Sequence, residues 1–302
     1  MTSTTALPVK CHPLAPQLTQ AVHAFLEQNW PFSSEKYKTA FFAMDFPRLL
    51  ALICPEGSLD RLESAALFVC LTGILDDAFS QMSISDSREI GLKLLNIMQG
   101  TVSADLSSPV EKVLAKIISD MNSQDAELAK DVLAGAIALF HAQTDKERLG
   151  ITQLDEYFEF RFRDVGGEFF TAIVRFVGGV MLEDSERVRL HDLERAAVRH
   201  FIIVNDILSW EKELREANES DHEGAALCSA VPILARNLGV GYEGAKRVLW
   251  VAAREVEGEI ERMVAGLGGL SDGERYAQGL RYFASGTEEW SRTTSRYRVG
   301  SE

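Results

Sequence analysis

Three oxygen-bearing side chains follow one another at four-residue spacing in a single stretch. Asn205, Ser209 and Glu213 occur in the sequence FIIVNDILSWEKE, which spans residues 201–213. On an α-helix each four-residue step turns the side chain by only about 40° and advances it by about 6 Å, so the three groups line one face. An amide oxygen, a hydroxyl and a carboxylate suit Mg²⁺, which usually shares its coordination with water and substrate phosphate. By periodicity alone, a plain amphipathic helix with a polar stripe remains the alternative.

A second pair of oxygen ligands, Asp76 and Asp77, ends a stretch that is almost wholly apolar from Ala65 to Leu75. Carboxylates are costly to bury without partners, so these two must meet solvent, cations or a metal. An exposed Asp-Asp pair at a helix end is the simpler interpretation. The parallel with the first stretch favours a site, because two separate helices each run apolar and then present oxygen ligands. We expect both sets of ligands at the same end of the core.

The elements that must position these groups are helices. From Leu18 onward apolar residues recur at three- and four-residue spacing, as in 62–75 and 186–214, and no stretch alternates convincingly as a strand. The connecting segments are short, so the helices should be antiparallel neighbours in one bundle. We therefore expect an all-α fold with a single domain over residues 18–302. Residues 1–17, which carry three prolines, are expected to form a loosely ordered leader.

Composition limits the function classes. The chain has 302 residues, is 46% hydrophobic and has a net charge of −14, which makes a nucleic-acid partner unexpected. An acidic protein that binds a small polyanion needs divalent cations to do so. The four cysteines have no paired spacing, which argues against a zinc site or a disulfide framework and favours a cytoplasmic protein. We find no secretory signal, and the longest nearly apolar run is too short to span a bilayer.

Taken together, the two ligand groups resemble the metal-binding motifs of class I terpene cyclases, particularly the fungal-type sesquiterpene synthases. The chain contains the pattern NDxxSxxxE in full, and Asn205 follows Asp76 by 129 residues, a distance that also resembles the family. The resemblance extends from about Leu18 to Arg298. It implies a helical barrel or bundle whose two motifs hold three Mg²⁺ against the diphosphate of a prenyl substrate. The metal ligands it implies are Asp76, Asn205, Ser209 and Glu213, with Asp77 beside them.

Further residues resemble the family's diphosphate-binding groups. Arg161 looks like the diphosphate-sensing arginine, with Arg163 as the alternative. Lys212 looks like the lysine that touches the diphosphate. Arg296 and Tyr297 resemble the closing Arg-Tyr pair, and Arg281-Tyr282 repeats the same letters. For each of these the competing interpretation is a solvated surface side chain.

The first motif departs from the family pattern, because Ser80 stands where a third acid belongs. The resemblance implies that Asp76 still binds metal, with Asp77 tied to an arginine, and it leaves the metal affinity or the closing motion in question. Gly166-Gly167 should break a helix, since paired glycines weaken helical order. The resemblance implies that this break lies beside the reacting cation, whereas close helix packing explains it equally well. Among the aromatic residues Phe68 is our preferred cavity member, before Phe42, Phe158 and Trp290.

The resemblance implies a Mg²⁺-dependent enzyme that ionises and cyclises farnesyl diphosphate to a sesquiterpene hydrocarbon or alcohol and releases diphosphate. A diterpene cyclase for geranylgeranyl diphosphate is the nearest alternative. A chain-elongating prenyltransferase should carry two DDxxD motifs, which this chain lacks. A non-catalytic helical scaffold is supported only by Ser80. A homodimer is a further expectation from the family, and we expect no membrane partner.

Overall fold

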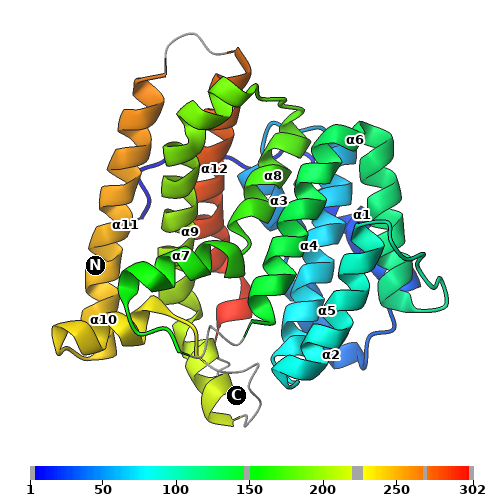
Figure 1. Ribbon diagram of the computed structural model, residues 1–302, viewed down its shortest axis with the longest axis horizontal. Coiled ribbons are helices and arrows are strands. Elements are labelled where there is room, and N and C mark those ends of the chain that lie inside the picture. Colours follow the sequence, from blue (N-terminus) through cyan, green and yellow to red (C-terminus); the bar gives the residue numbers. More distant parts are fainter. Residues whose placement is uncertain (1–3, 146–149, 220–226, 268–270, 299–302) are drawn as a thin grey trace.

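The chain folds into a bundle of helices with no strand among the residues that the structure describes. In this computed structural model these are residues 4–145, 150–219, 227–267 and 271–298 (Figure 1). The prediction of an all-α fold is confirmed. The helices are α1 (Ala15–Asn29), α2 (Glu35–Ala43), α3 (Phe46–Ile53), α4 (Leu59–Phe79), α5 (Ile84–Met98), α6 (Pro109–Gln143), α7 (Leu154–Asp164), α8 (Gly167–Gly178), α9 (Asp184–Glu219), α10 (Ala230–Leu238), α11 (Tyr242–Ala265) and α12 (Ser271–Thr293), followed by the 3₁₀ turn η3 (Ser295–Tyr297).

The two helices that carry the predicted ligands are longer than their apolar patterns indicated. Helix α4 continues to Phe79, so Asp76 and Asp77 lie in its last turn rather than beyond it. Helix α9 runs from Asp184 to Glu219 and includes the whole polar row from Asn205 to Glu213. Both ligand groups are therefore held on helical backbone, which fixes their directions.

The long helices pack side by side around α8 and α12. Helix α8 packs against α6 and α12, and α12 also packs against α3 and α9, while α4 lies against α6 and α8 (Figure 1). The 3₁₀ turn η3, drawn in red below α12, contacts both α9 and α2. The C-terminal segment thus returns to the end of the bundle where α4 and α9 carry their polar residues. Among the described helices, none has an apolar span long enough to cross a bilayer.

The predicted leader, residues 1–17, makes fixed contacts from its first described residues onward, while residues 1–3 lie outside the described part of the chain. Leu7 is 3% exposed. The Ala6 N–H donates to Glu257 at 3.0 Å, and the Ser285 hydroxyl donates to the Pro8 carbonyl at 2.6 Å. Helix α1 then begins at Ala15, before the expected boundary. The proline-rich segment lacks helical periodicity, but its buried leucine and backbone hydrogen bonds hold it against α11 and α12.

Candidate active site

A cavity of about 210 Å³ lies at the end of the bundle where α4, α9 and η3 meet. Asp76 and the whole polar row of α9 line it, together with every predicted diphosphate-binding residue, whereas Asp77 does not. Its deeper wall is apolar. The lining comprises Phe46, Leu49, Val69, Thr72, Gly73, Asp76, Ser80, Leu139, Gln143, Arg161, Asp164, Val165, Phe170, Phe201, Asn205, Ser209, Lys212, Glu213, Glu216, Leu227, Cys228, Trp290, Arg296 and Tyr297.

Asp76 points into the mouth of the cavity from the last turn of α4. Its side chain is 47% exposed, whereas that of Asp77 is 20% exposed. The Gln143 amide donates to Asp76 Oδ1 at 3.2 Å from the end of α6. Ser80, which replaces the third acid of the family pattern, donates its hydroxyl to the Asp77 carbonyl at 2.9 Å. Ser80 therefore caps the helix end while still lining the cavity.

Arg296 joins the C-terminal turn to both aspartates. Its Nη2 lies 2.7 Å from Asp76 Oδ2 and its Nη1 lies 2.9 Å from Asp77 Oδ1. The side chain is only 7% exposed, so two carboxylates offset most of the cost of burying the guanidinium. Arg281, the competing match to the Arg-Tyr pair, pairs with Glu261 on α11 at 2.7 Å and does not line the cavity.

The polar row of α9 forms the opposite rim. Asn205 accepts a hydrogen bond from Arg161 Nη2 at 2.8 Å and donates its amide to the Tyr297 hydroxyl at 2.8 Å. The Ser209 hydroxyl can donate to Glu213 Oε1 at 2.6 Å or to the Asn205 carbonyl at 2.7 Å. The i to i+4 contact thus orients Ser209 and Glu213, while Arg161 and Tyr297 orient the Asn205 amide, before any ligand is bound.

Arg161 is the hub of the charged network beneath this rim. Besides Asn205 it pairs with Asp164 through Nη1 and with Asp206 through Nε at 3.5 Å, and its side chain is 12% exposed. Asp206 is completely buried and accepts hydrogen bonds from Tyr157 and from the Ala230 N–H, at 2.7 and 2.8 Å. Arg163, the alternative for the same role, is exposed and lies outside the cavity lining.

Two further groups complete the polar rim. Lys212 lines the cavity with 16% of its side chain exposed and pairs with Glu216 at 2.9 Å. Burial raises the pKa of Tyr297 to about 12, so its phenol stays neutral and remains a hydrogen-bond donor at physiological pH. Lys212 and Tyr297 therefore add a cation and a neutral donor to the charge of Arg161 and Arg296.

The predicted helix break at Gly166 is present. Helix α7 ends at Asp164 and α8 begins at Gly167, while Gly166 adopts φ +80°, a conformation that L side chains rarely adopt. The break turns Val165 and Phe170 toward the cavity. Close packing also applies, because a Cβ on Gly167 would lie 2.6 Å from the Phe162 carbonyl and 2.7 Å from Val198. Gly166 therefore permits the turn and Gly167 allows the close packing, while a position beside the reacting cation stays a prediction.

Phe68 does not line the cavity, contrary to expectation. It is fully buried and packs edge-to-face on Phe169 with ring centroids 4.9 Å apart. Eight residues on a helix leave Phe68 roughly 80° around the axis from Asp76, whereas Val69, seven residues away, lies on the same face and does line the cavity.

Two other aromatic guesses also fall outside the cavity lining. Phe42 stacks on His23, and Phe158 packs on Tyr157. Trp290 is confirmed as a lining residue. The sequence reasoning missed Phe46 and Phe170. The nearby glycine break was the available signal for Phe170, since it redirects the first turn of α8.

The donor set fits a Mg²⁺ site that is completed by water and a substrate. Asp76, Asn205, Ser209 and Glu213 are oxygen donors on two walls of one cavity. Among the described residues these carboxylates do not gather with other acids, cysteines or histidines into a compact cage. Mg²⁺ is ordinarily held by one or two carboxylates plus substrate phosphates rather than by an all-protein cage.

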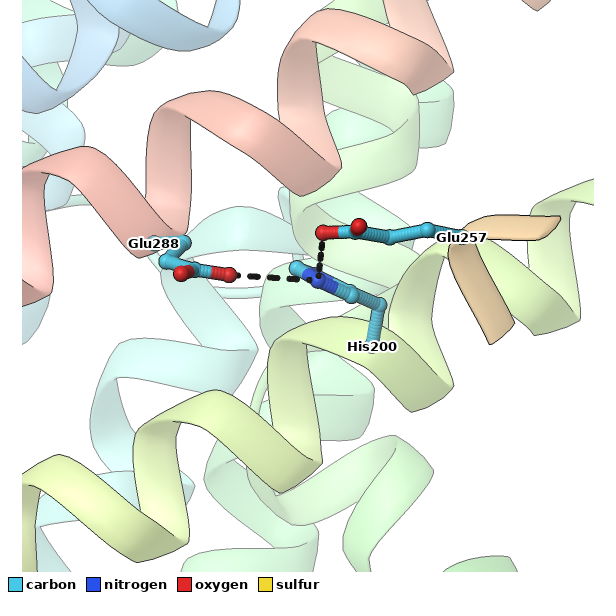
Figure 2. A group of neighbouring side chains, drawn as sticks. All are labelled: His200, Glu257 and Glu288. Carbon is cyan, nitrogen blue, oxygen red and sulfur yellow. Dashed lines mark hydrogen bonds and ion pairs between the residues drawn. The ribbon is translucent and has the colours of Figure 1, made fainter. Parts of the chain in front are cut away.

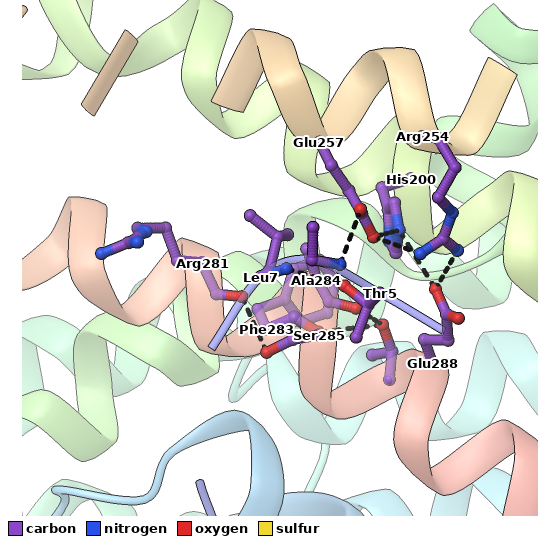
Figure 3. Close-up of polar contacts among 12 residues, drawn as sticks. Thr5, Leu7, His200, Arg254, Glu257, Arg281, Phe283, Ala284, Ser285 and Glu288 are labelled. Atoms are coloured by element: carbon purple, nitrogen blue, oxygen red, sulfur yellow. Dashed lines mark hydrogen bonds and ion pairs between the residues drawn. The ribbon is translucent and has the colours of Figure 1, made fainter. Parts of the chain in front are cut away.

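A separate buried cluster does bring ligand-type atoms together. His200 Nε2 lies 3.1 Å from Glu257 and 3.4 Å from Glu288 (Figure 2). Arg254 bridges both carboxylates, and Arg292 pairs with Glu288 at 2.7 Å. Thr5 and Leu7 of the N-terminal segment lie beside this cluster (Figure 3).

Both carboxylates of this cluster are already paired with cationic side chains of the protein. Burial alone lowers the pKa of His200, but the hydrogen bonds to Glu257 and Glu288 outweigh it and leave that pKa above its ordinary value. Burial likewise opposes ionisation of Glu288, yet hydrogen bonds from its cationic neighbours lower its pKa to about 2. Two carboxylates thus already face three cations, and a divalent ion would add further like charge. We interpret the cluster as an internal ion network that joins α9, α11 and α12.

Comparisons with known proteins agree with this geometry. A family model described as terpene synthase family 2, C-terminal metal binding, matches residues 67–257. Aristolochene synthase of Aspergillus terreus is 37% identical over 96% of this chain and 92% of its own length. That of Penicillium roqueforti is 36% identical over 95% of this chain and 85% of its own length. The crystal structure of aristolochene synthase from Penicillium roqueforti superimposes with a TM-score of 0.85 at 33% identity, covering 97% of this chain and 99% of that one.

Proposed function

The chain belongs to terpene synthase family 2, and from this premise we propose that it converts farnesyl diphosphate to a sesquiterpene hydrocarbon or alcohol and releases diphosphate. One observation carries the proposal. The oxygen ligands of α4 and of α9 face one cavity, and the turn after α12 bonds to both of them through Arg296 and Tyr297. The similarity to aristolochene synthases supports the fifteen-carbon substrate.

We propose that Asp76, Asn205, Ser209 and Glu213 hold the metal and that the cationic residues of the rim bind the diphosphate. Three Mg²⁺ ions, the number expected from the family, would neutralise the diphosphate oxygens as the C–O bond breaks. Arg161, Lys212 and Arg296 place three positive side chains around the same volume. Their attraction grows as charge moves onto the leaving group, so it stabilises the transition state more than the bound substrate.

In the same proposal, the apolar wall receives the hydrocarbon chain and excludes water from the cation that forms. Phe46, Phe170, Phe201 and Trp290 supply aromatic surface to this wall. An aromatic face within about 6 Å of a cation stabilises it by about 0.5 to 2 kcal/mol once water is excluded. No protein nucleophile is needed, because departure of the diphosphate itself generates the reactive carbon.

To test the proposal, purified protein is incubated with farnesyl or geranylgeranyl diphosphate and Mg²⁺, and the extracted products are analysed by gas chromatography and mass spectrometry. We expect cyclic fifteen-carbon products. Cyclic twenty-carbon products alone would indicate the diterpene alternative, and no product from either substrate would indicate a scaffold.

We further propose that the chain forms a homodimer. Two exposed apolar side chains, Val248 and Val251, lie three residues apart on one face of α11 and support this. Single apolar residues are ordinary on a surface, whereas neighbouring ones favour contact. Light scattering on wild type and on Val251→Glu tests the proposal, since a monomeric wild type contradicts it.

A further inference from the structure

The wall of the cavity contains a glycine in the interior of a helix. Gly73 lies one turn before Asp76 on the face of α4 that lines the cavity. Glycine destabilises a helix interior relative to alanine, so its presence there calls for a structural reason. A Cβ built on Gly73 would lie 2.7 Å from Cζ and 2.8 Å from Cε2 of Phe46. The ring of Phe46 therefore occupies the space that a side chain at position 73 would need.

Two other tight helical glycines of the bundle, Gly135 and Gly286, contact backbone atoms instead. A Cβ on Gly135 would lie 2.6 Å from the backbone of Phe169, and one on Gly286 would lie 2.7 Å from the backbone of Leu52. Those two glycines allow helix backbones to approach each other. At Gly73 the three nearest atoms all belong to one aromatic side chain, which itself lines the cavity.

The ring of Phe46 is held on its other sides. It stacks on Trp290 with centroids 5.5 Å apart, packs on Phe41 at 5.6 Å, and lies under the Arg296 guanidinium at 5.6 Å. Its backbone is fixed as well, because Asp45 adopts φ +55° and the indole N–H of Trp290 is within hydrogen-bonding distance of the Asp45 carbonyl, at 3.1 Å. A ring displaced from Gly73 therefore has to move toward the cavity or against Arg296.

We propose that Gly73 and Phe46 form a specificity-determining pair, in which the missing side chain at 73 sets the position of the ring and the ring sets the contour of the cavity next to the diphosphate rim. This inference rests on the proposed cyclase function. The pair lies between Asp76 and Trp290, where the chain adjoining the diphosphate has to fold. A shift of the ring changes which conformers of the substrate fit, and therefore which products form.

The test is a double-mutant cycle on the product spectrum with farnesyl diphosphate and Mg²⁺. In Gly73→Ala the displaced ring should reduce the share of the main wild-type product roughly twofold to tenfold, in favour of acyclic and monocyclic products, because forcing a side chain off its rotamer changes barriers by that factor. In a Phe46→Leu background the same glycine substitution should change the spectrum by less than about twofold, because the clashing ring is gone.

Gly279→Ala is the matched control. Its Cβ would lie 2.6 Å from Val174 Cγ1, a comparable side-chain clash between α12 and α8, but Gly279 does not line the cavity. It should change the melting temperature and leave the product ratios as in wild type. If Gly73→Ala does not fold, Phe46→Leu alone tests the claim, and it should also alter the spectrum at least twofold.

The outcomes distinguish a failure of the proposed cyclase function from a failure of the Gly73–Phe46 pair. Wild-type protein that makes no cyclic product contradicts the proposed function. An active wild type whose spectrum is unchanged in Gly73→Ala contradicts only the specificity pair, as does a glycine substitution that has the same effect with and without Phe46. A product change in Gly279→Ala equal to that in Gly73→Ala would also overturn the inference, because any tight glycine would then suffice.

Discussion

Replacing Arg161 with lysine keeps the positive charge and removes the geometry of the guanidinium. Arg161 uses three nitrogens on three partners, Asp164, Asn205 and Asp206, whereas lysine offers one nitrogen. A hydrogen bond to a charged group is worth about 1.5 to 3 kcal/mol, and the 3.5 Å contact to Asp206 is weaker than the other two. Losing the contact to Asn205 and the weaker one to Asp206 should therefore lower the free energy of unfolding by about 2 to 4 kcal/mol.

The same substitution releases the Asn205 amide from one of its two partners. A shift of about 1 Å in a positioning group can reduce a rate about 100-fold, so we expect kcat/KM for farnesyl diphosphate to fall by about that factor. Urea unfolding and steady-state kinetics measure the two effects. Arg163→Lys is the control, since Arg163 lies two residues away on an exposed face and should change neither. Wild-type stability and turnover in Arg161→Lys would refute the reasoning.

The remaining predictions concern the metal rim and the buried ion network. Glu213→Ala should abolish turnover, because it removes the carboxylate of the α9 rim, and a residual rate near wild type would remove Glu213 from that role. Ser80→Asp should lower the Mg²⁺ concentration needed for half-maximal rate, because it adds a carboxylate one turn after Asp76 on the same wall; an unchanged Mg²⁺ profile would contradict this. Because its pKa is raised in the folded protein, protonated His200 stabilises the folded state. This stabilisation is complete below the pKa of unfolded histidine, about 6.5, and is lost as the pH rises through the pKa of His200 in the folded protein. Urea unfolding at pH 6 and pH 9 should therefore show that His200→Phe lowers the free energy of unfolding relative to wild type, and by less at the higher pH. The exposed control His191→Phe should not lower it. A loss of stability in His200→Phe that is the same at both pH values would contradict a charged His200.

The positions of the polar rim could be predicted from sequence because each depends on local helical geometry. Asn205, Ser209 and Glu213 line one face whatever their neighbours, since four-residue spacing fixes their relative directions. The position of the C-terminal Arg-Tyr pair was less certain, because the Arg-Tyr dipeptide occurs twice, at Arg281-Tyr282 and at Arg296-Tyr297. Only the fold shows that Arg281 turns toward Glu261 while the later arginine reaches the aspartates.

The apolar wall and the buried ion network could not be predicted in the same way. Spacing within α4 places Val69, and not Phe68, on the face of Asp76, but which residues of other helices complete the wall depends on how those helices pack. Phe46 reaches the cavity because its helix starts at a left-handed Asp45 clamped by a residue on α12. The contacts of His200 with Glu257 and Glu288 join three helices that are distant in sequence. Such contacts follow from tertiary packing.

The most direct test of the central claim is calorimetric titration of the protein with inorganic diphosphate, with Mg²⁺ and with a chelator. If the rims of α4 and α9 hold the diphosphate jointly through metal, wild type should bind only when Mg²⁺ is present, and either Asp76→Ala or Asn205→Ala should weaken binding at least tenfold. Equal binding in the presence of the chelator, or wild-type affinity in both variants, would contradict the account.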